Sequence, residues 1–221
     1  MTPPSTVMRK DRIRIGLLGC GRIAVRHAEL LGKRQIEDAC LAAVCDIQHE
    51  RAAAMAEKHD VPAFESLDAM LAGADLDAVA VLTPSGLHAD HAVSILRAGA
   101  HAIVEKPMAL TLEDADRMVV AAREAKRHLL VVKQNRFNVP VVKAREALDA
   151  GRFGQLVLGT VRVRWCREQK YYDQDGWRGT WVMDGGVVAN QASHHVDMLQ
   201  WFMGPVESVH ARSLRALVNI E

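Results

Sequence analysis

Short apolar runs alternate with amphipathic stretches along the first 134 residues of the chain. The apolar runs predict β-strands at residues 12–19, 40–46, 76–84, 101–107 and 128–134. The stretches between them predict helices at residues 22–33, 47–60, 66–72, 88–100 and 111–127. Such alternation produces parallel sheets through right-handed crossovers, and nearly continuous apolar strands indicate a sheet covered on both faces. The pattern therefore predicts an α/β fold with a doubly wound parallel sheet, whose active site lies at the carboxyl ends of the strands.

Three of these helices carry signals at their ends. Ser66 is expected to cap the start of one helix, and Gly99 is expected to close another. Thr111 and Asp114 have the spacing of a capping box, with Asp in place of the usual Glu.

The pattern changes after residue 135. We expect a helix and turn at 139–154, a long alternating strand at 155–165, a loop rich in aromatic, charged and glycine residues at 166–186, a helix at 190–202 and a mostly strand-like end at 206–221. Two long strands and two helices make a marginal sheet by themselves. We therefore expect a flexible tail at 1–10, an α/β domain at 11–134 and an incomplete, C-terminally truncated α+β domain at 135–221.

Charge, hydropathy and cysteine usage exclude several classes of protein. The formal net charge of +1 argues against nucleic-acid binding, because nucleic-acid-binding proteins carry a basic excess. The N-terminus lacks the apolar core of a signal peptide and no apolar run approaches about 18 residues, so no membrane partner is expected. Cys40 and Cys45 flank one predicted strand, which suits neither a disulfide nor a closed zinc site. Free structural thiols of this kind fit a cytoplasmic protein.

The first predicted strand runs into a glycine-rich turn, GLLGCGRIA. This turn contains Gly19-x-Gly21-x-x-Ala24 between a strand and a helix, which is the context that a dinucleotide-binding turn requires. Gly19 allows the tight turn, Gly21 lets the backbone approach a pyrophosphate, and Ala24 lets the helix pack closely on the strand. The helix N-terminus would offer free N–H groups to the phosphates. The turn therefore predicts a Rossmann-type dinucleotide site.

Asp46 ends the second predicted strand, where an acidic side chain accepts hydrogen bonds from a ribose 2′-hydroxyl. It lies further along the chain than the usual spacing of about 20 residues, because the intervening loop is long. A carboxylate there repels a 2′-phosphate, so Asp46 favours NAD over NADP, although Arg51 could soften that preference.

Lys106 stands in the sequence VEKP, at the carboxyl end of a central predicted strand. Pro107 fixes its own φ and biases Lys106 towards an extended backbone. A lysine held there would point at whatever lies on the nicotinamide, which makes it a candidate catalytic residue. A surface lysine before a turn is the alternative interpretation.

Four motifs in this order resemble the Gfo/Idh/MocA oxidoreductase family. They are the GxGxxA turn, TPSGLHADHA at 83–92, EKPMALTLEDA at 105–115 and NQASHHVD at 190–197. The resemblance covers essentially the whole chain, and the combination is specific where a single motif would not be. It implies a Rossmann domain, a second domain with a large, mostly antiparallel sheet, and NAD(P)-dependent chemistry on sugar, inositol and related hydroxyls. It also implies a homo-oligomer for a full-length form.

The resemblance assigns roles to individual residues. Lys106 matches the catalytic lysine of the family, and His194 matches the histidine of its Asp-x-x-x-His pattern, a suitable general base at neutral pH. Which of the two takes the proton first stays open. Asn190 occupies the aspartate position of the pattern; it cannot exchange protons but can orient a sugar. The residues expected to bind NAD are Gly19, Gly21, Arg22, Ile23, Asp46, Thr83, Glu105 and His88, the last of which could equally cap its helix.

A closer resemblance concerns residues 131–140, 171–181 and 185–202. These segments look like the bacterial dehydrogenases that oxidise the 3-hydroxyl of UDP-N-acetylglucosaminuronate for surface polysaccharide, a subgroup that also has Asn in place of Asp. This acidic nucleotide sugar would need cations, and arginine binds carboxylates and phosphates as a fork. The candidate substrate-binding residues are Asn190, Arg178, Tyr171, Asn135 and Arg136; Arg162 and Arg164 fit a solvated strand face equally well.

The adjacent His194 and His195, followed by Asp197, raise the question of a metal site. Neighbouring residues on a helix point about 100° apart, so the two histidines cannot easily hold one ion, and no metal is expected. His194 and Asp197 share a helix face, so Asp197 is expected to help orient the imidazole of His194. His195 is expected to pack or to cap.

Two alternatives stay open. One is another sugar or polyol dehydrogenase of the same family, which the loop at 171–181 would distinguish. The other is an inactive, truncated homologue that only binds the cofactor, because the chain ends where family members usually continue with further sheet strands.

Overall fold

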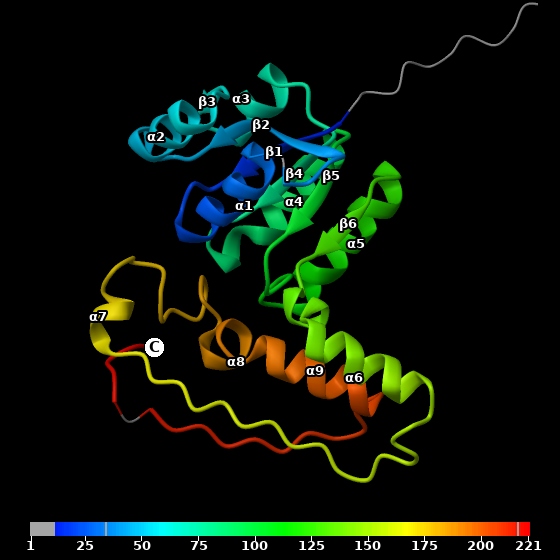
Figure 1. The fold of residues 1–221 in the computed structure, drawn as a ribbon. Helices are drawn as coiled ribbons and strands as arrows, with labels where there is room; N and C mark the ends of the chain where they lie inside the picture. The colour runs from blue at the N-terminus through cyan, green and yellow to red at the C-terminus, as the bar shows by residue number, and fades with distance from the viewer. Residues whose placement is uncertain (1–11, 34, 216) are drawn as a thin grey trace, which may run out of the picture. The chain divides into compact units, whose positions relative to one another are not determined.

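The computed structural model describes residues 12–33, 35–215 and 217–221 of the chain. They divide into two compact units, whose segments interleave along the sequence (Figure 1). Unit 1 holds the chain up to Thr83, His88–Glu105 and Asp116–Leu130, and unit 2 holds Pro84–Leu87, Lys106–Ala115 and Val131–Glu221. The tail expected at 1–10 lies outside the described residues, and the division expected after residue 134 stays a prediction.

Unit 1 is built around a six-stranded sheet in the order β3-β2-β1-β4-β5-β6. The strands are β1 (Ile13–Leu18), β2 (Ala39–Cys45), β3 (Ala63–Phe64), β4 (Ala78–Val81), β5 (His101–Val104) and β6 (Leu129–Val131). β1 pairs in parallel with both β2 and β4, so the chain changes direction across the sheet at β1. The predicted α/β class and doubly wound parallel sheet are confirmed. Only β3, two residues long, carries too short a pattern to be recognised in the sequence.

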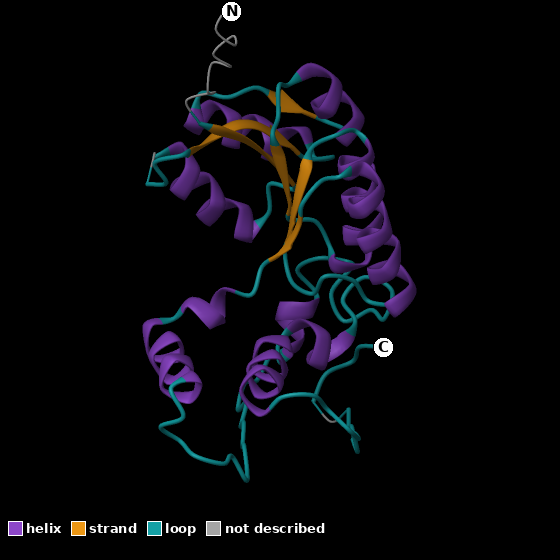
Figure 2. Ribbon diagram, turned by 90° about the vertical axis from the view of Figure 1, so that its right-hand side faces the viewer, coloured by secondary structure: helices purple, strands orange, loops and turns teal. Residues whose placement is uncertain are grey.

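Five helices accompany this sheet, and Figure 2 shows helices on both sides of it. They are α1 (Arg22–Gly32), α2 (His49–His59), α3 (Leu67–Gly73), α4 (His88–Arg97) and α5 (Leu112–Ala125). The apolar strand residues Leu17, Val44 and Val79 are fully buried, as expected of a sheet covered on both faces.

The predicted caps are present. Ser66 Oγ accepts a hydrogen bond from the backbone N–H of Ala69 at 3.2 Å. Thr111 Oγ1 accepts from the N–H of Asp114 at 3.1 Å and donates its own proton to the Asp114 carboxylate at 2.9 Å. The shorter Asp side chain thus bonds the capping hydroxyl, whereas the Glu of a full capping box bonds the N-cap backbone.

Unit 2 contains two short 3₁₀ helices and four α-helices. They are η1 (Ser85–Leu87), η2 (Gln134–Phe137), α6 (Val139–Asp149), α7 (Gln169–Tyr172), α8 (Gly186–Asn190) and α9 (Ser193–Met203). The single helix predicted at 190–202 is wrong at its start. Gln191 and Ala192 interrupt the helix although both keep right-handed helical dihedral angles, so Asn190 ends one helix and Ser193 begins the next.

The strands predicted at 155–165 and 206–221 are also wrong. The described residues of both segments form neither helix nor strand. Val157 is 88% exposed and the adjacent Leu158 is 82% exposed, although these neighbours point to opposite sides of an extended chain. Alternation can predict which face of a strand would be buried, but a strand forms only where a neighbouring chain accepts its backbone hydrogen bonds.

The search for a membrane span returned nothing over the described residues: none of their helices is both long enough and apolar enough to cross a bilayer.

We predict that Gly19→Ala destabilises unit 1 more than Gly99→Ala does. Both glycines have a positive φ, +97° and +91°, so both substitutions strain the backbone. A Cβ at Gly19 would lie 2.9 Å from the carbonyl oxygen of Leu82, whereas the nearest atom at Gly99 lies 3.9 Å away on a flexible Arg127. Urea unfolding should therefore show an additional loss of about 1–3 kcal/mol for Gly19→Ala. Equal losses would show that the Leu82 contact does not matter.

Candidate active site

The glycine-rich turn joins β1 to α1. The N–H of Gly19 donates to the carbonyl of Cys45 at 2.7 Å, which ties the turn to the end of β2. Gly21 has a φ of −76°, which any residue adopts, and a Cβ built there meets no protein atom within 4 Å. Neither backbone strain nor packing within the protein requires glycine at this position. The open space suits a group from outside the chain, and a pyrophosphate at the start of α1 fits it.

The first turn of α1 matches that interpretation. It contains no acidic residue, and Gly21 offers no side chain to cap its N–H groups. Arg22 and Ile23 are exposed beside the turn, whereas Ala24 is buried against the sheet as predicted. A small side chain at Ala24 lets the helix approach β1 closely.

Asp46 lies beside the same turn. It is 9% exposed, and one carboxylate oxygen accepts from the N–H of Cys20 at 2.8 Å while the other accepts from the N–H of Gln48 at 2.8 Å. These bonds fix the carboxylate next to the proposed pyrophosphate position. Each oxygen keeps acceptor capacity for a ribose hydroxyl, because a carboxylate offers about four lone-pair sites.

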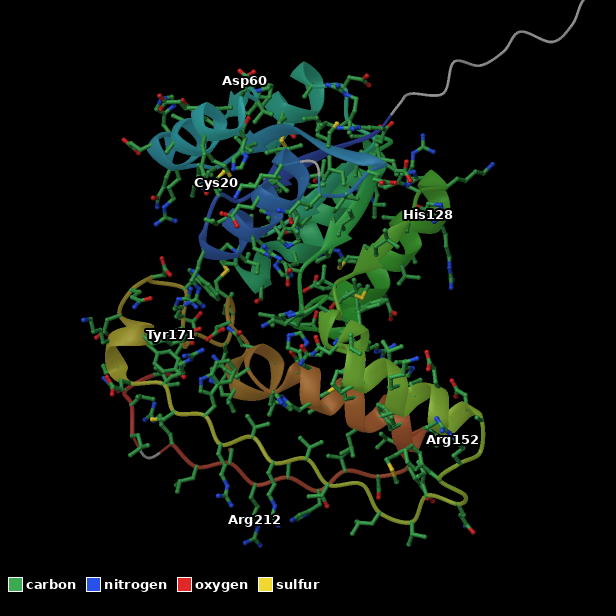
Figure 3. All side chains as sticks on the ribbon, in the orientation of Figure 1. Cys20, Asp60, His128, Arg152, Tyr171 and Arg212 are labelled. Atoms are coloured by element: carbon green, nitrogen blue, oxygen red, sulfur yellow. The ribbon has the colours of Figure 1, made fainter. Side chains whose placement is uncertain are left out.

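Two buried thiols border this site, and Figure 3 labels Cys20. Burial raises the pKa of Cys20 to about 12, with a further contribution from the negative charge of Asp46. Burial and the same carboxylate raise the pKa of Cys45 to about 11. Both residues are free thiols, as the sequence predicts.

The loop after β4 is held by histidines. His88 is 1% exposed, and its Nε2 donates to the backbone carbonyl of Thr83 at 2.9 Å. The hydroxyl of Thr83 also bonds His91 Nδ1 at 3.0 Å. His88 therefore braces this loop from within unit 1, and a direct contact between His88 or Thr83 and NAD stays a prediction.

Glu105 follows β5 and is buried. Its carboxylate lies 3.2 Å from Nε2 of His27, a residue of α1. The pair links the end of β5 to the helix that follows the glycine-rich turn. Contact between Glu105 and NAD stays a prediction.

A line of hydrogen bonds in unit 2 reaches Lys106. Its ammonium group donates to the backbone carbonyl of Asn190 at 2.7 Å and to the side-chain oxygen of Asn190 at 3.2 Å. The side-chain amide of Asn190 donates to Asp184, and Asp184 also accepts from the N–H of Gly179 at 2.8 Å. The fold thus brings together Lys106 and Asn190, which are 84 residues apart in the sequence.

His194 is the second residue of the next helix, α9. Its Nε2 lies 3.1 Å from the side-chain nitrogen of Gln134, a residue of η2. When that amide nitrogen donates, Nε2 carries the lone pair and the ring proton is on Nδ1. The Nε2 atom is then the basic site of the imidazole.

Asp197 has two cationic partners, and its expected role in orienting His194 stays a prediction. Its carboxylate accepts two hydrogen bonds from Arg136, at 2.8 and 2.7 Å, and lies 3.6 Å from the ammonium group of Lys133. Burial alone would raise the pKa of Asp197, but the bonds from Arg136 and the charge of Lys133 lower it overall. The shared helix face predicted proximity, but two cations from a distant segment compete more strongly for a carboxylate than a neutral ring does.

Arg136 has partners within unit 2, and the expectation that it binds substrate stays a prediction. The guanidinium group forks onto Asp197 and stacks on Trp201, with 4.8 Å to the ring centroid. Arg136 therefore joins η2 to α9. Asn135, its neighbour in η2, is half-buried, and its contact with substrate stays a prediction.

Residues 171–181, the aromatic loop, form a compact cluster around Arg178, near the Tyr171 labelled in Figure 3. The guanidinium group donates to Asp175 at 2.9 Å and to the hydroxyl of Tyr171 at 2.7 Å. It also lies over the rings of Tyr171 and Trp177, at 4.7 and 4.5 Å from their centroids. The loop thus holds a pre-positioned cation, part of whose charge Asp175 already compensates.

Over the residues that the structure describes, no group of three or more His, Cys, Asp or Glu side chains is arranged to hold a metal ion.

Two family models match the chain. Residues 13–133 match the oxidoreductase family described as having an NAD-binding Rossmann fold, and residues 141–219 match the Gfo/Idh/MocA C-terminal domain. The chain belongs to the Gfo/Idh/MocA oxidoreductase family. The predicted family and its cofactor, NAD, are confirmed.

Solved structures of this family resemble the chain closely. The WlbA dehydrogenase from Chromobacterium violaceum, crystallised with NADH and UDP-GlcNAcA, is 46% identical with a TM-score of 0.93, over 97% of this chain and 62% of its own. The WlbA dehydrogenase from Bordetella pertussis, crystallised with the same two molecules, is 45% identical with a TM-score of 0.92, over 95% of this chain and 64% of its own.

Curated family members extend the range of substrates. A myo-inositol 2-dehydrogenase from Thermotoga maritima is 31% identical over 90% of this chain and 58% of its own length. A D-glucoside 3-dehydrogenase from Escherichia coli strain K12 is 30% identical over 96% of this chain and 60% of its own length. The chain thus spans about three-fifths of the length of these relatives.

Sequence reasoning missed two residues of the Gfo/Idh/MocA site. Asp184 is 1% exposed and accepts a hydrogen bond from the side chain of Asn190. Gln134 contacts His194. The available signal for Asp184 was its position: it is an acidic residue directly before Gly185-Gly186, in an otherwise aromatic and apolar context. Gln134 carried none, because its partner lies 60 residues away.

We predict that Gly21→Ala weakens NADH binding without destabilising the fold. The added methyl group meets no protein atom but occupies the space assigned to the pyrophosphate. Fluorescence titration should show an affinity at least about tenfold lower, which corresponds to about 1.4 kcal/mol. Urea unfolding of the unliganded protein should be unchanged. Unaltered NADH affinity would place the cofactor elsewhere.

We also predict that the contact between η2 and α9 weakens in acid. Because the folded-state pKa of Asp197 is lowered, its ionised form contributes stability that is present above the unfolded-state pKa and lost as the pH falls through the folded-state pKa. Asp197→Asn should cost about 2 kcal/mol at neutral pH and remove this acid dependence. Tryptophan fluorescence during urea unfolding at several pH values measures both effects.

Glu146→Gln is the matched control for Asp197→Asn. Glu146 pairs with Lys143 on an exposed helix face, where an ion pair contributes little. If Asp197→Asn leaves the loss of stability at low pH unchanged, another group is responsible for that loss.

Proposed function

We propose that this chain belongs to an NAD-dependent dehydrogenase that oxidises the 3-hydroxyl of UDP-N-acetylglucosaminuronate (UDP-GlcNAcA) to a 3-keto sugar nucleotide. The observation that carries the proposal is the contact between Lys106 and Asn190 in a chain 46% identical to a dehydrogenase crystallised with this sugar nucleotide. Asn190 stands where the wider family pattern has Asp, and the subgroup that it resembles shares this difference.

Unit 1 would hold the cofactor. In this proposal the start of α1 binds the pyrophosphate, and Asp46 accepts hydrogen bonds from the ribose hydroxyls. When bound, NAD⁺ supplies the acceptor for a hydride. The negative charge of Asp46 would disfavour a 2′-phosphate, which supports NAD over NADP.

Unit 2 would hold the groups that act on the alcohol. When the substrate hydroxyl takes the place of the Gln134 amide at Nε2, His194 takes its proton while a hydride leaves the carbon that bears the hydroxyl, so the alcohol becomes a ketone. Lys106 donates a hydrogen bond to the oxygen as negative charge develops on it. The amide of Asn190 holds the lysine and orients the sugar.

The aromatic loop would recognise the acidic part of the substrate. A guanidinium group has five N–H donors, and Asp175 and Tyr171 account for two of the hydrogen bonds of Arg178. The remaining donors suit a carboxylate or phosphate, so Arg178 and Tyr171 remain our proposed substrate contacts. The homo-oligomer expected for a full-length form stays a prediction.

A second candidate is the oxidation of a polyol or glycoside without a nucleotide. The inositol and D-glucoside dehydrogenases support it, at 31% and 30% identity over most of this chain. It requires no anion-binding group, so the cation held in the aromatic loop favours the nucleotide sugar.

The test measures absorbance at 340 nm with NAD⁺ or NADP⁺ and a panel of UDP-GlcNAcA, UDP-N-acetylglucosamine, myo-inositol and a D-glucoside. We expect the highest kcat/KM for UDP-GlcNAcA with NAD⁺. Lys106→Met should lower kcat by about 100- to 1,000-fold, because it removes a donor to the developing oxyanion. Lys143→Met, on an exposed face of α6, should leave it unchanged.

Three outcomes would decide against parts of this proposal. Turnover of inositol or glucoside alone would reject the nucleotide sugar. Wild-type activity in Lys106→Met would reject the role of the lysine. Binding of NADH without turnover of any substrate would favour a chain that only binds the cofactor.

A further inference from the structure

The carboxylate of Asp184, which the proposed reaction does not use, is the most deeply buried acidic group near Lys106. Asp184 is 1% exposed and accepts from the N–H of Gly179 at 2.8 Å and from the side-chain amide of Asn190. Asn190 in turn accepts from the ammonium group of Lys106 through its side-chain and backbone oxygens. One line of hydrogen bonds therefore connects the backbone of the aromatic loop to the proposed catalytic lysine.

The polarity of this line is fixed at both ends. A carboxylate only accepts hydrogen bonds, and an ammonium group only donates them. The amide of Asn190 fits between them in one orientation, with its NH₂ group towards Asp184 and its oxygen towards Lys106. In the reverse orientation, two acceptors would face each other at Asp184, and two donors would face each other at Lys106. The neighbours of Asn190 thus determine which way its amide points.

We propose that Asp184 is a positioning residue: it fixes the amide of Asn190, and that amide holds Lys106 where the reaction needs its ammonium group. The inference rests on the proposed function for what Lys106 does in catalysis, but the arrangement itself can be tested without substrate. The essential feature is a pair of one carboxylate and one amide at positions 184 and 190.

The line of hydrogen bonds can form with the carboxylate and the amide in either order at positions 184 and 190. If Asp184→Asn and Asn190→Asp are combined, the amide at position 184 accepts from Gly179 with its oxygen. Its NH₂ group donates to the carboxylate at position 190, which accepts from Lys106. Each single substitution breaks the pattern. Asp184→Asn turns an NH₂ group against the N–H of Gly179, against another NH₂ group or towards Lys106. Asn190→Asp sets a half-buried carboxylate against the buried one of Asp184.

The first experiment is this exchange, assayed with UDP-GlcNAcA and NAD⁺. Each single variant should lower kcat by about 100-fold, the effect of a displaced catalytic group. The double variant should recover at least about tenfold over either single variant, a coupling that independent sites do not show. KM should change less than kcat. Asp149→Asn, on an exposed helix face, is the isosteric control, and NADH binding and urea unfolding check the fold of each variant.

The second experiment needs no turnover. Trace labelling of the unliganded protein with acetic anhydride, followed by peptide mass spectrometry, gives the reactivity of Lys106 relative to the exposed Lys143. Asp184→Asn should raise that ratio by about tenfold, because the loss of one charge-assisted hydrogen bond frees the amine. The double variant should return it to the wild-type value.

The outcomes separate the two proposals. A folded double variant no more active than the poorer single variant, or an unchanged Lys106 reactivity in Asp184→Asn, would overturn the positioning role. If the wild-type protein turns over no UDP-GlcNAcA but the labelling ratio follows the predicted pattern, the proposed function fails and the positioning role stands.

Discussion

The pairing of β1 with β2 and β4 determines where the cofactor groups of unit 1 lie. Parallel strands end at the same edge of a sheet, and four of the residues assigned to NAD lie at strand ends. Gly19, Asp46 and Glu105 directly follow β1, β2 and β5, and Thr83 lies two residues beyond β4. The backbone of Gly19 bonds Cys45 at the end of β2 and lies against Leu82, just beyond β4. Three segments far apart in the sequence therefore meet at one glycine, where a larger residue would strain the backbone and crowd Leu82. A shift of register by one residue would turn the strand side chains to opposite faces and separate these groups.

Unit 2 depends on a different kind of contact. It lacks a sheet among its described residues, and ion pairs and amides join its helices. The fork of Arg136 on Asp197 attaches η2 to α9, and this attachment brings Gln134 to His194. Asn190, which contacts Lys106, ends α8, and His194 lies in the first turn of α9. Two of the candidate residues are therefore positioned by helix ends, whereas Lys106 lies just beyond the end of β5.

Local patterns predicted most of unit 1, because its helices and strands follow from apolar periodicity and from caps such as Ser66. They failed where the outcome depends on distant partners. Residues 155–165 alternate like a strand, yet in the described chain no neighbouring strand pairs with them. Asp197 shares a helix face with His194, but the two cations that bind it lie some 60 residues away. Asp184 became recognisable only when the fold placed Asn190 and Gly179 around it.

The buried carboxylate of Asp46 has a consequence for the durability of the cofactor loop. Oxidants and electrophiles attack the thiolate form of cysteine rather than the thiol. Cys20 lies between the two cofactor glycines, and with its pKa raised to about 12 it is almost entirely protonated at neutral pH. Burial contributes most to this shift, and the charge that would select the ribose adds to it. The thiol nearest the glycine-rich turn is therefore a poor target for oxidation to sulfenic acid.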